Sequence, residues 1–338
     1  MKELSLFNKI VFFFNNVCAL LFIASFVIPY IAPKTFPLIA VISLLVPFLL
    51  SAHLVFIIYW IITGFKKHMF LSVFCIILSI IFSAFPYEFN KKVITSNNEL
   101  SLMTYNVHLF NKYNWINKEN LATNIVDFIH KQDPDILAVQ EFSPNSKVNF
   151  NYPYKSIVLK GEKISFGQAI FSKYKIISKG SVDFDNSSNN AIYVDILKNK
   201  DTIRIYNIHL ESLRLGNNQE LLIEEKSDKI IRRLTKGFVK QQEQVEKFLE
   251  HKAQFKGKII ISGDLNNTSY SWVYHQIKKE MYDTFIEAGN GFGKTFDLRK
   301  YPLRIDFILV DETMEVNEHQ NFTVVYSDHF PVMARIGL

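Results

Sequence analysis

Polar side chains repeatedly follow apolar segments in the second part of this sequence. The clearest case is Asp264 and Asn266, which follow Gly263 and the run Lys258–Ser262, a segment that predicts a buried strand. A carboxylate and an amide two positions apart point the same way if the strand continues that far. The pair suits a hydrated cation, a water molecule or a phosphate oxygen, although the same residues are common in ordinary turns. The motif therefore gains weight only from others of its kind.

Earlier segments carry the same signature. Leu100–Leu109 is expected to be a strand, and its Asn106 is a poor strand former, which suggests a ligand role. Glu141 follows the short expected strand Ile136–Val139. It is either a solvated loop residue or, at the carboxyl end of a buried strand, a good oxygen ligand for Mg²⁺. The other candidates of this kind are Gln140, beside Glu141, and Asn207 and His209 on the alternating strand Thr202–Leu210.

The C-terminal part adds a buried acid and a polar triplet. Arg304–Val310 is an expected strand with Asp306 inside an otherwise apolar run. An unpaired carboxylate in such a place is expensive, so Asp306 needs a strong partner. The expected strand Phe322–Tyr326 leads to Ser327, Asp328 and His329, and Pro331–Ile336 completes the sheet.

Helical patterns separate the strands. Asn120–Lys131 has apolar residues at helical spacing, and Gln219–His251 is a charged helical stretch that forms either one helix or two helices broken near Gly237. Gly289–Lys294 lacks the ending and the following helix of a phosphate-binding P-loop. The other expected elements are the helix Tyr270–Lys279 and the strands Ser165–Ser172 and Ala191–Leu197. This alternation predicts an α/β sandwich with a site along one edge of two sheets.

Taken in chain order, the motifs resemble those of the endonuclease/exonuclease/phosphatase superfamily, which includes DNase I-like nucleases, neutral sphingomyelinases and inositol-polyphosphate phosphatases. The resemblance covers about residues 98–338. It implies a four-layer α/β/β/α fold and Mg²⁺-dependent hydrolysis of a phosphoester. The tyrosine that nucleases of this group use near the scissile phosphate has no assignable position, so the substrate stays open. The six motifs are Asn106, Gln140-Glu141, Asn207-x-His209, Asp264-x-Asn266, Asp306 and Ser327-Asp328-His329.

The resemblance also implies a role for each residue. Glu141 would be the principal metal ligand, with Asn106 close by and Asp328 supporting the metal or its waters. His329 or Asp264 would accept the proton of the attacking water. The remaining implied roles are Asp306 holding the tautomer of His329, Asn266 orienting the water and a phosphate oxygen with Asp264, His209 donating to the developing charge, Gln140 positioning Glu141, and Asn207 in a supporting place.

The choice of metal follows from the donor atoms. A cation on the phosphoester oxygens offsets the charge that repels a hydroxide. Few carboxylates and several amides suit Mg²⁺, which keeps most of its waters, and Mn²⁺ is an alternative. Zinc is not supported, because His209 and His329 lack a helical or cysteine-paired ligand pattern.

The first ninety residues differ in composition. Three stretches without a formal charge, Ile10–Ile31, Phe36–Thr63 and Met69–Tyr87, are each about as long as the ~20 residues that cross a bilayer. A signal peptide has one short apolar core, and a soluble core helix of this length would carry charge. Residues 1–92 are therefore expected to be a membrane region with about three transmembrane helices, and residues 98–338 a catalytic domain. The expected partners are the lipid bilayer and a phosphoester substrate.

Charge is uneven in the same way. The 338 residues have a formal net charge of +6, of which seven lysines against two acids in residues 1–92 supply +5. The basic balance thus reports lysines that flank membrane segments and gives no support for a nucleic-acid-binding face. With the N-terminus and the second loop inside, four lysines lie inside against three outside, which favours an extracytoplasmic catalytic domain. Cys18 and Cys75 both lie in the apolar region, so no disulfide is expected elsewhere.

The sequence thus predicts an integral, multi-pass membrane protein with a Mg²⁺-dependent phosphoesterase domain that acts at the bilayer surface, on a phosphodiester or phosphomonoester such as a lipid headgroup. Two alternatives stay open. An extracytoplasmic nuclease acting on DNA or RNA would need a basic stripe beside the site, which folding could assemble. An inactive membrane-bound binding module is disfavoured by the intact set of motif residues.

Overall fold

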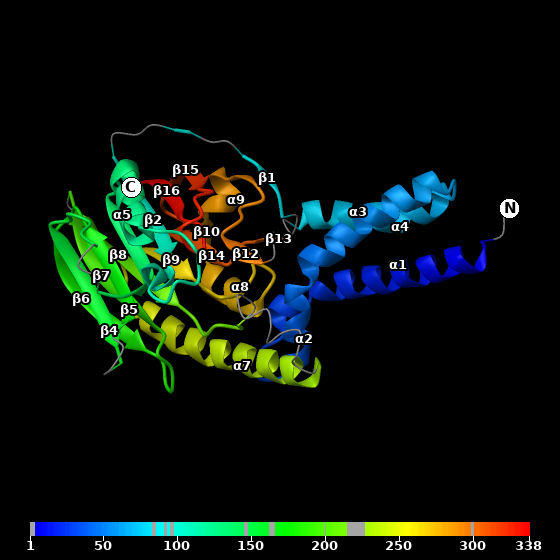
Figure 1. Ribbon diagram of the computed structural model, residues 1–338, viewed down its shortest axis with the longest axis horizontal. Coiled ribbons are helices and arrows are strands. Elements are labelled where there is room, and N and C mark those ends of the chain that lie inside the picture. The colour runs from blue at the N-terminus through cyan, green and yellow to red at the C-terminus, as the bar shows by residue number, and fades with distance from the viewer. Residues whose placement is uncertain are drawn as a thin grey trace.

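Residues 98–338 form two six-stranded sheets that face each other, with helices on their outer sides (Figure 1). The structure is a computed structural model, and it describes residues 4–82, 86–90, 93–94, 98–144, 148–161, 166–199, 201–214, 227–298 and 301–338. The N-terminal helices project from one side of this sandwich.

The first sheet has the strand order β15-β16-β2-β3-β5-β4. Its central pair, β2 and β3, is parallel, and the other neighbours are antiparallel. The sheet is therefore mixed, and the carboxyl ends of β2 and β3 lie at the same edge. The strands are β2 (Glu99–Asn106), β3 (Ile136–Phe142), β4 (Tyr154–Lys160), β5 (Phe166–Ser172), β15 (Glu315–Asn321) and β16 (Val332–Gly337).

The second sheet has the order β10-β14-β9-β8-β7-β6 and again one parallel pair, β8 and β9. Two short pairs, β1 with β11 and β12 with β13, lie outside the sheets. The strands are β6 (Ile176–Asp183), β7 (Asn190–Lys198), β8 (Asp201–His209), β9 (Lys258–Asp264), β10 (Met281–Asp283), β14 (Asp306–Asp311), β1 (Glu88–Phe89), β11 (Asn290–Gly291), β12 (Phe296–Leu298) and β13 (Tyr301–Leu303).

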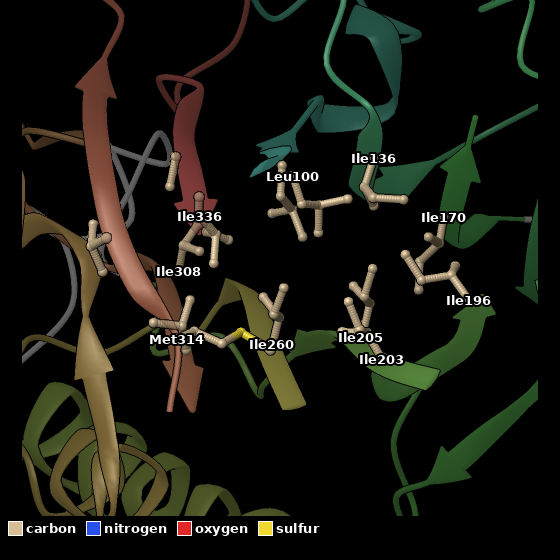
Figure 2. Close-up of a cluster of buried hydrophobic side chains, with 14 of the residues drawn as sticks. Leu100, Ile136, Ile170, Ile196, Ile203, Ile205, Ile260, Ile308, Met314 and Ile336 are labelled. Atoms are coloured by element: carbon tan, nitrogen blue, oxygen red, sulfur yellow. The ribbon is translucent and has the colours of Figure 1, made fainter. Parts of the chain in front are cut away.

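An aliphatic core fills the space between the two sheets (Figure 2). Leu100 and Ile136 of the first sheet meet Ile205 and Ile260 of the second, and all four are fully buried. Because side chains alternate across a strand, residues at every second position of each central strand enter this layer. The same alternation carries on to the polar residues at the strand ends.

Helices close the outer faces, so the sandwich has four layers, as expected. α5 (Leu121–Gln132) contributes Ile125 and Ile129 to a core cluster with Met103 and Leu137 of the first sheet. α7 (Ser227–Lys252) and α8 (Trp272–Lys278) pack in the same way on the second sheet. The other short helices of this part are η4 (His108–Asn111) and α9 (Thr284–Ala288).

Two expected strands differ from the structure. The strand expected at Leu100–Leu109 ends at Asn106, since residues 108–111 have left-handed backbone angles. Phe322–Tyr326 is not a strand; Phe322 is apolar because it packs in the core beside α5. The strand next to β16 is instead β15, which the sequence did not predict. Because β15 lies at the edge of the sheet and pairs only with β16, it is rich in polar residues.

Gly237 does not break α7, which runs unbroken over 26 residues. A Cβ at this position would lie 2.7 Å from Cδ2 of Leu213, so the glycine allows close packing of that side chain. The expected helical residues 219–226 lie outside the described part of the chain.

The N-terminal residues fold into a separate helical unit (Figure 1). By length and composition, only Leu6–Tyr30 among the described helices can cross a membrane on its own, and Pro37–Leu44 with Val46–Ile62 qualifies only as a pair bent by 53°. The third helix, α4, has 13 residues and covers about 20 Å, less than the ~30 Å hydrocarbon core. The helices are α1 (Leu6–Ser25), η1 (Ile28–Tyr30), α2 (Pro37–Val41), η2 (Ile42–Leu44), α3 (Val46–Ile62), η3 (Lys66–His68) and α4 (Met69–Ile81).

The expectation of three transmembrane helices, and with it of a multi-pass protein, is therefore not supported. The described residues contain one candidate span, or two if the bent pair is one span. The sequence count failed because apolar length alone does not reveal the break at Leu45, just before α3 with its early Pro47, or the short extent of α4.

The helical unit has polar groups inside and apolar groups outside. Asn15, His53 and Ser72 are fully buried. The Asn15 amide donates to Ser72 Oγ at 2.8 Å, and Ser72 Oγ lies 3.0 Å from Nδ1 of His53. In contrast, Leu20 and Val55 on α1 and α3 are 68% and 64% exposed. This distribution is the reverse of that in a water-soluble helical bundle.

The unit also packs on the sandwich. The backbone N–H of Lys34 donates to Gln242 Oε1 of α7 at 2.7 Å, and its ammonium pairs with Glu246 at 2.6 Å. The Thr268 hydroxyl donates to the carbonyl of Ser43 at 3.3 Å. These contacts reach the segment that directly follows β9.

The backbone at the end of β9 requires a glycine at position 263. Its φ is +131°, and a Cβ would lie 2.1 Å from the carbonyl oxygen of Ile208 on the neighbouring strand. We expect Gly263→Ala to destabilise the protein by roughly 2 kcal/mol or more, because strain and a backbone clash add. The measurement is thermal unfolding of the full-length protein.

The matched control is Gly337→Ala, where the three atoms nearest to a Cβ all belong to side chains, and the closest is Cβ of Glu315 at 3.3 Å. Equal melting temperatures for the two variants would contradict the proposed backbone constraint.

Candidate active site

The two sheets bring four strand ends to one edge of the sandwich. In the second sheet His209 is the register partner of Asp264, which is also the partner of Asp306 on the antiparallel β14. In the first sheet Asn106 is the partner of Gln140. Parallel pairing of β2 with β3 and of β8 with β9 therefore fixes most of the predicted residues at the same level.

Asn106 connects the two sheets. Its amide group donates to Asp264 Oδ2 at 3.1 Å and lies 3.4 Å from Glu141 Oε1, and its carbonyl oxygen accepts the backbone N–H of His108 at 3.1 Å. Asn106 is 1% exposed, so these contacts satisfy a buried side chain. The arrangement places the Glu141 carboxylate and the Asp264 carboxylate on either side of one amide.

Asp264, His329 and Asp306 form a buried chain of charged groups. Nδ1 of His329 lies 2.9 Å from Asp306 Oδ2, and its Nε2 lies 3.7 Å from Asp264 Oδ2. Burial opposes protonation of His329, but the charges of Asp306 and Asp264 outweigh it and hold the pKa of the imidazole well above its ordinary value. Burial and the Asp306 charge raise the pKa of Asp264 to about 7, against the opposing charge of His329.

His209 and Asn266 border the same carboxylate. His209 Nε2 is 3.6 Å from Asp264 Oδ2, and burial with the charge of His329 lowers the pKa of His209 to about 3, so its ring is neutral. The backbone N–H of Asn266 donates to Asp264 Oδ1 at 2.7 Å, and its amide donates to the Leu210 carbonyl at 3.0 Å. Asp264 is thus fixed from three directions.

A bulge in β3 aims Glu141 at the site. The pairing of β3 with β5 shifts register between Val139 and Phe142, and Glu141 has a φ of 51°, which is uncommon for a residue with a Cβ. Such bulges redirect a side chain at the end of a strand. Burial, with the nearby charge of Asp328, raises the pKa of Glu141.

His108 is a site residue that the sequence did not identify. Its Nδ1 pairs with Asp328 Oδ1 at 2.9 Å, and its ring stacks on Trp115 with centroids 4.0 Å apart and planes 11° apart. Burial works against ionisation of Asp328, but His108 and the charge of His329 hold the pKa of Asp328 at about 2. The available signal was the spacing of His108 two positions after Asn106.

Gln140 and Asn207 lie behind the site and join the sheets. The Gln140 amide donates to Asn207 Oδ1 at 2.6 Å and to the Thr104 hydroxyl at 2.9 Å, and the Asn207 amide donates to the carbonyls of Val139 and Ala169. Both side chains are fully buried. Their surroundings are those of structural cross-links under the reacting groups.

The loop Ser327-Asp328-His329 is tied to its surroundings on both sides. The Ser327 hydroxyl donates to the carbonyl of Asn106 at 2.8 Å, and the backbone N–H of Asp297 donates to the Asp328 carbonyl at 3.1 Å. Phe296 of β12 packs on the ring of His329, with centroids 4.9 Å apart. The hairpin β12–β13 is therefore one wall of the site, and no sequence motif indicated it.

Two sets of side chains could hold a metal ion. The donor atoms of Asp264, Asp306 and His329 lie within 4.8 Å of one another, but Nδ1 of His329 already contacts Asp306 in this chain. The predicted set of Glu141, Asp328 and Asn106 offers only oxygens of the kind that Mg²⁺ prefers. A cation there would offset the burial and the Asp328 charge that raise the pKa of Glu141.

Comparison with known proteins agrees with this geometry. Residues 103–329 match the model of the Endonuclease/Exonuclease/phosphatase family, and residues 8–84 match a domain family of unknown function. No curated protein matches the chain.

Solved structures share the fold at low identity. A Bacteroides vulgatus endonuclease/exonuclease/phosphatase matches with a TM-score of 0.54 and 16% identity over 72% of this chain and 100% of that chain. Humanized TDP2 from D. rerio has a TM-score of 0.52 and 15% identity over 71% and 99%. A mannosyl-6-phosphatase of Bacteroides thetaiotaomicron has 0.51 and 15% over 71% and 100%. Since the family match covers well over half of the sequence, this chain belongs to the endonuclease/exonuclease/phosphatase family.

Proposed function

We propose that this protein is a membrane-anchored, Mg²⁺-dependent phosphoesterase in which a water molecule attacks phosphorus. The observation that carries the proposal is the contact chain from Glu141 through Asn106 and Asp264 to His329, which joins an oxygen-rich metal site to an acid–base pair. Family membership supports a hydrolase that acts on phosphoester bonds. The proposal goes beyond family membership in two respects, which are the dependence on a metal ion and a lipid headgroup as the substrate.

Glu141, Asp328 and Asn106 would hold the metal, with Mg²⁺ as the first choice and Mn²⁺ as the alternative. When bound, the ion supplies positive charge to the phosphoryl oxygens. Asn106 would keep its amide on Glu141 and Asp264 beside the ion. Burial opposes ionisation of Asp328, but His108 and the charge of His329 hold its pKa low, so its carboxylate is already charged.

Asp264 is the favoured proton acceptor. A base works best when its pKa is near the working pH, and burial with the Asp306 charge raises the pKa of Asp264 to about 7. The raised pKa of His329 keeps its imidazole protonated at neutrality. Asp264 would take the proton of the attacking water as the water oxygen bonds to phosphorus. The P–O bond to the leaving alkoxide then breaks, and the alkoxide takes up a proton. His329 would offer its Nε2 proton to the phosphoryl group while Asp306 holds the ring.

His209 and Asn266 complete the anion-binding surface. A neutral His209 donates one N–H, which would be directed to a non-bridging oxygen as negative charge develops. Asn266, held by Asp264 and Leu210, would orient the water. Both side chains act without changing their own charge.

Membrane anchoring is supported by the reversed polarity of the helical unit. Leu20 on α1 and Val55 on α3 are exposed, whereas Asn15 and Ser72 are buried and hydrogen-bonded to each other. Polar contacts between helices with apolar outer surfaces are typical of membrane helices.

A lipid headgroup is the proposed substrate because two walls of the site rest on this helical unit. Thr268, four residues after Asp264, bonds the Ser43 carbonyl. Tyr301 of β13 stacks on Phe48 of α3 with centroids 4.2 Å apart, and its hydroxyl lies 2.9 Å from Ser51 Oγ. The membrane helices therefore support the same segments that frame the reacting groups.

The pair of Asp306 and His329 predicts a pH-dependent stability. Since the folded pKa of His329 lies above its unfolded value near 6.5, the pair adds stability that is fully present below about pH 6.5 and is lost as the pH rises through the folded pKa. Asp306→Asn should therefore destabilise the protein by about 2 kcal/mol near pH 6. The difference in the free energy of unfolding between wild type and Asp306→Asn should become smaller at higher pH. Unfolding measured over a range of pH values checks this.

Asp311→Asn, at the other end of the same strand, is the control, and its gap to wild type should not follow this pH course. If the gap of Asp306→Asn also stayed constant with pH, the imidazole would not be its titrating partner.

Catalysis is tested with Glu141→Gln and His329→Ala. With Mg²⁺ or Mn²⁺ and bis-p-nitrophenyl phosphate, we expect each to lose roughly 100-fold or more of kcat/KM. Glu141→Gln should also weaken Mn²⁺ binding in calorimetry. Glu312→Gln, an exposed turn residue, should behave as wild type.

Unchanged activity in both site variants would refute the mechanism. A second panel of phospholipid vesicles, sphingomyelin, plasmid DNA and RNA separates the substrate classes. Hydrolysis of DNA alone, with a steep loss in salt, would favour a nuclease over the lipid-side phosphoesterase.

Membrane anchoring is tested by alkaline carbonate extraction of membranes. The double variant Leu20→Arg/Ile23→Arg places charges on exposed positions of α1. At roughly 3 kcal/mol for each arginine at the bilayer centre, it should shift the protein from the pellet to the soluble fraction. Ile231→Arg, equally apolar and exposed on α7, should leave the distribution unchanged. A wild-type protein that is washed off completely would contradict anchoring.

A further inference from the structure

A cavity of about 360 Å³ separates the helical unit from the catalytic sandwich. Phe26, directly after α1, and Tyr30 of η1 form one side, and Phe82, directly after α4, extends it. The opposite side comes from α8, α9 and β13. The volume is within the range of small-molecule binding sites, and the reacting groups described above are not among the residues that line it.

The wall on the membrane side is continuous with the outer apolar surface of the helices. Tyr30 and Phe82 line the cavity and are also 83% and 63% exposed. Phe292, on the sandwich side, is 53% exposed. A chain of methylene groups lying along α1 and α4 could therefore enter the cavity from this side over apolar and aromatic side chains.

The deep wall of the cavity is polar but electrically balanced. Arg304 Nη1 donates to Asp283 Oδ2 at 2.6 Å, and the Tyr274 hydroxyl donates to the same oxygen at 2.6 Å. The guanidinium also lies over the ring of Phe285, 4.7 Å from its centroid. Because this pair is satisfied internally, the wall does not demand a charged ligand at that end.

The rim carries the unbalanced charge. Lys278 of α8 lines the cavity one turn from His275. Glu88 is the one acidic side chain among the described residues that line the cavity, and the charges that act on it are those of Arg304, Asp283 and Glu287, not that of Lys278. An ammonium at the rim of an apolar cavity complements an amphiphile with a phosphate at one end.

From these four observations we propose that the cavity binds one acyl chain of a bilayer phospholipid, whose phosphate lies at Lys278. The inference rests on the proposed membrane placement of α1. It adds a second, non-catalytic lipid site beneath the active site. Thr268, Ser269 and Tyr270 line the cavity and belong to the segment that follows Asp264, so the lipid would form part of the support of that segment.

The test measures bound lipid and not activity. The full-length protein is reconstituted in nanodiscs of palmitoyl-oleoyl phosphatidylglycerol, kept in EDTA, and released into native mass spectrometry. We expect wild type to retain one phospholipid. Ile286→Trp, which fills the cavity from α9, should retain roughly tenfold less, equivalent to about 1.4 kcal/mol. Ile177→Trp on β6, an exposed residue outside the cavity, should retain as much as wild type.

A second pair of variants tests the proposal even if Ile286→Trp does not fold. Lys278→Glu reverses the rim charge and should retain about fivefold less lipid, from ~1 kcal/mol per lysine near a phosphate surface. Lys279→Glu, the next and exposed residue, should match wild type. Wild type without lipid, or equal retention in Lys278→Glu and Lys279→Glu, would overturn the proposal.

These outcomes are distinguishable from failure of the proposed function. A protein that retains lipid but hydrolyses no phosphoester supports the cavity and refutes the enzyme. A protein that hydrolyses a phosphoester but retains no lipid supports the enzyme and refutes the cavity proposal. Purification without detergent would refute the membrane placement and, with no lipid retained, the cavity proposal as well.

Discussion

The site depends on one amide that is shared between two sheets. Asn106 ends a strand of the first sheet and donates to Asp264, which ends a strand of the second, while Glu141 lies on its other side. If the sheets slid by one residue, the alternation of side chains would turn these groups away from each other. The aliphatic layer between the sheets and the buried contact of Gln140 with Asn207 resist that movement. Packing therefore fixes the register, and the register fixes the chemistry.

The same edge concentrates charges that would be unstable singly. Asp264, Asp306 and His329 are all nearly fully buried, and each needs the others, because an isolated buried charge is costly. Their coupling gives a carboxylate with a raised pKa next to an imidazole with a raised pKa.

The segments of the sandwich that contact the helical unit also carry residues of the site. Thr268 and Tyr301 contact α3 or the segment just before it, while their own segments also carry Asp264 and Phe296. A membrane embedding of α1 would then fix how the strand edge faces the bilayer surface. The cavity beneath Thr268 lies at this junction, where lipid-facing and catalytic surfaces meet.

The sequence by itself determined the sandwich and most strands, because strand alternation is a local pattern. It also indicated ten polar residues at or near strand ends, and their catalytic roles stay predictions. It missed His108, whose importance comes only from Asp328, more than two hundred positions away, and it missed the polar edge strand β15. It predicted three membrane spans, whereas the described residues contain one candidate, or two if the bent pair is one span, because apolar length does not reveal where a helix bends or stops. Register, the bulge at Glu141 and the wall formed by β12 depend on contacts between distant segments, and only the tertiary structure could decide them.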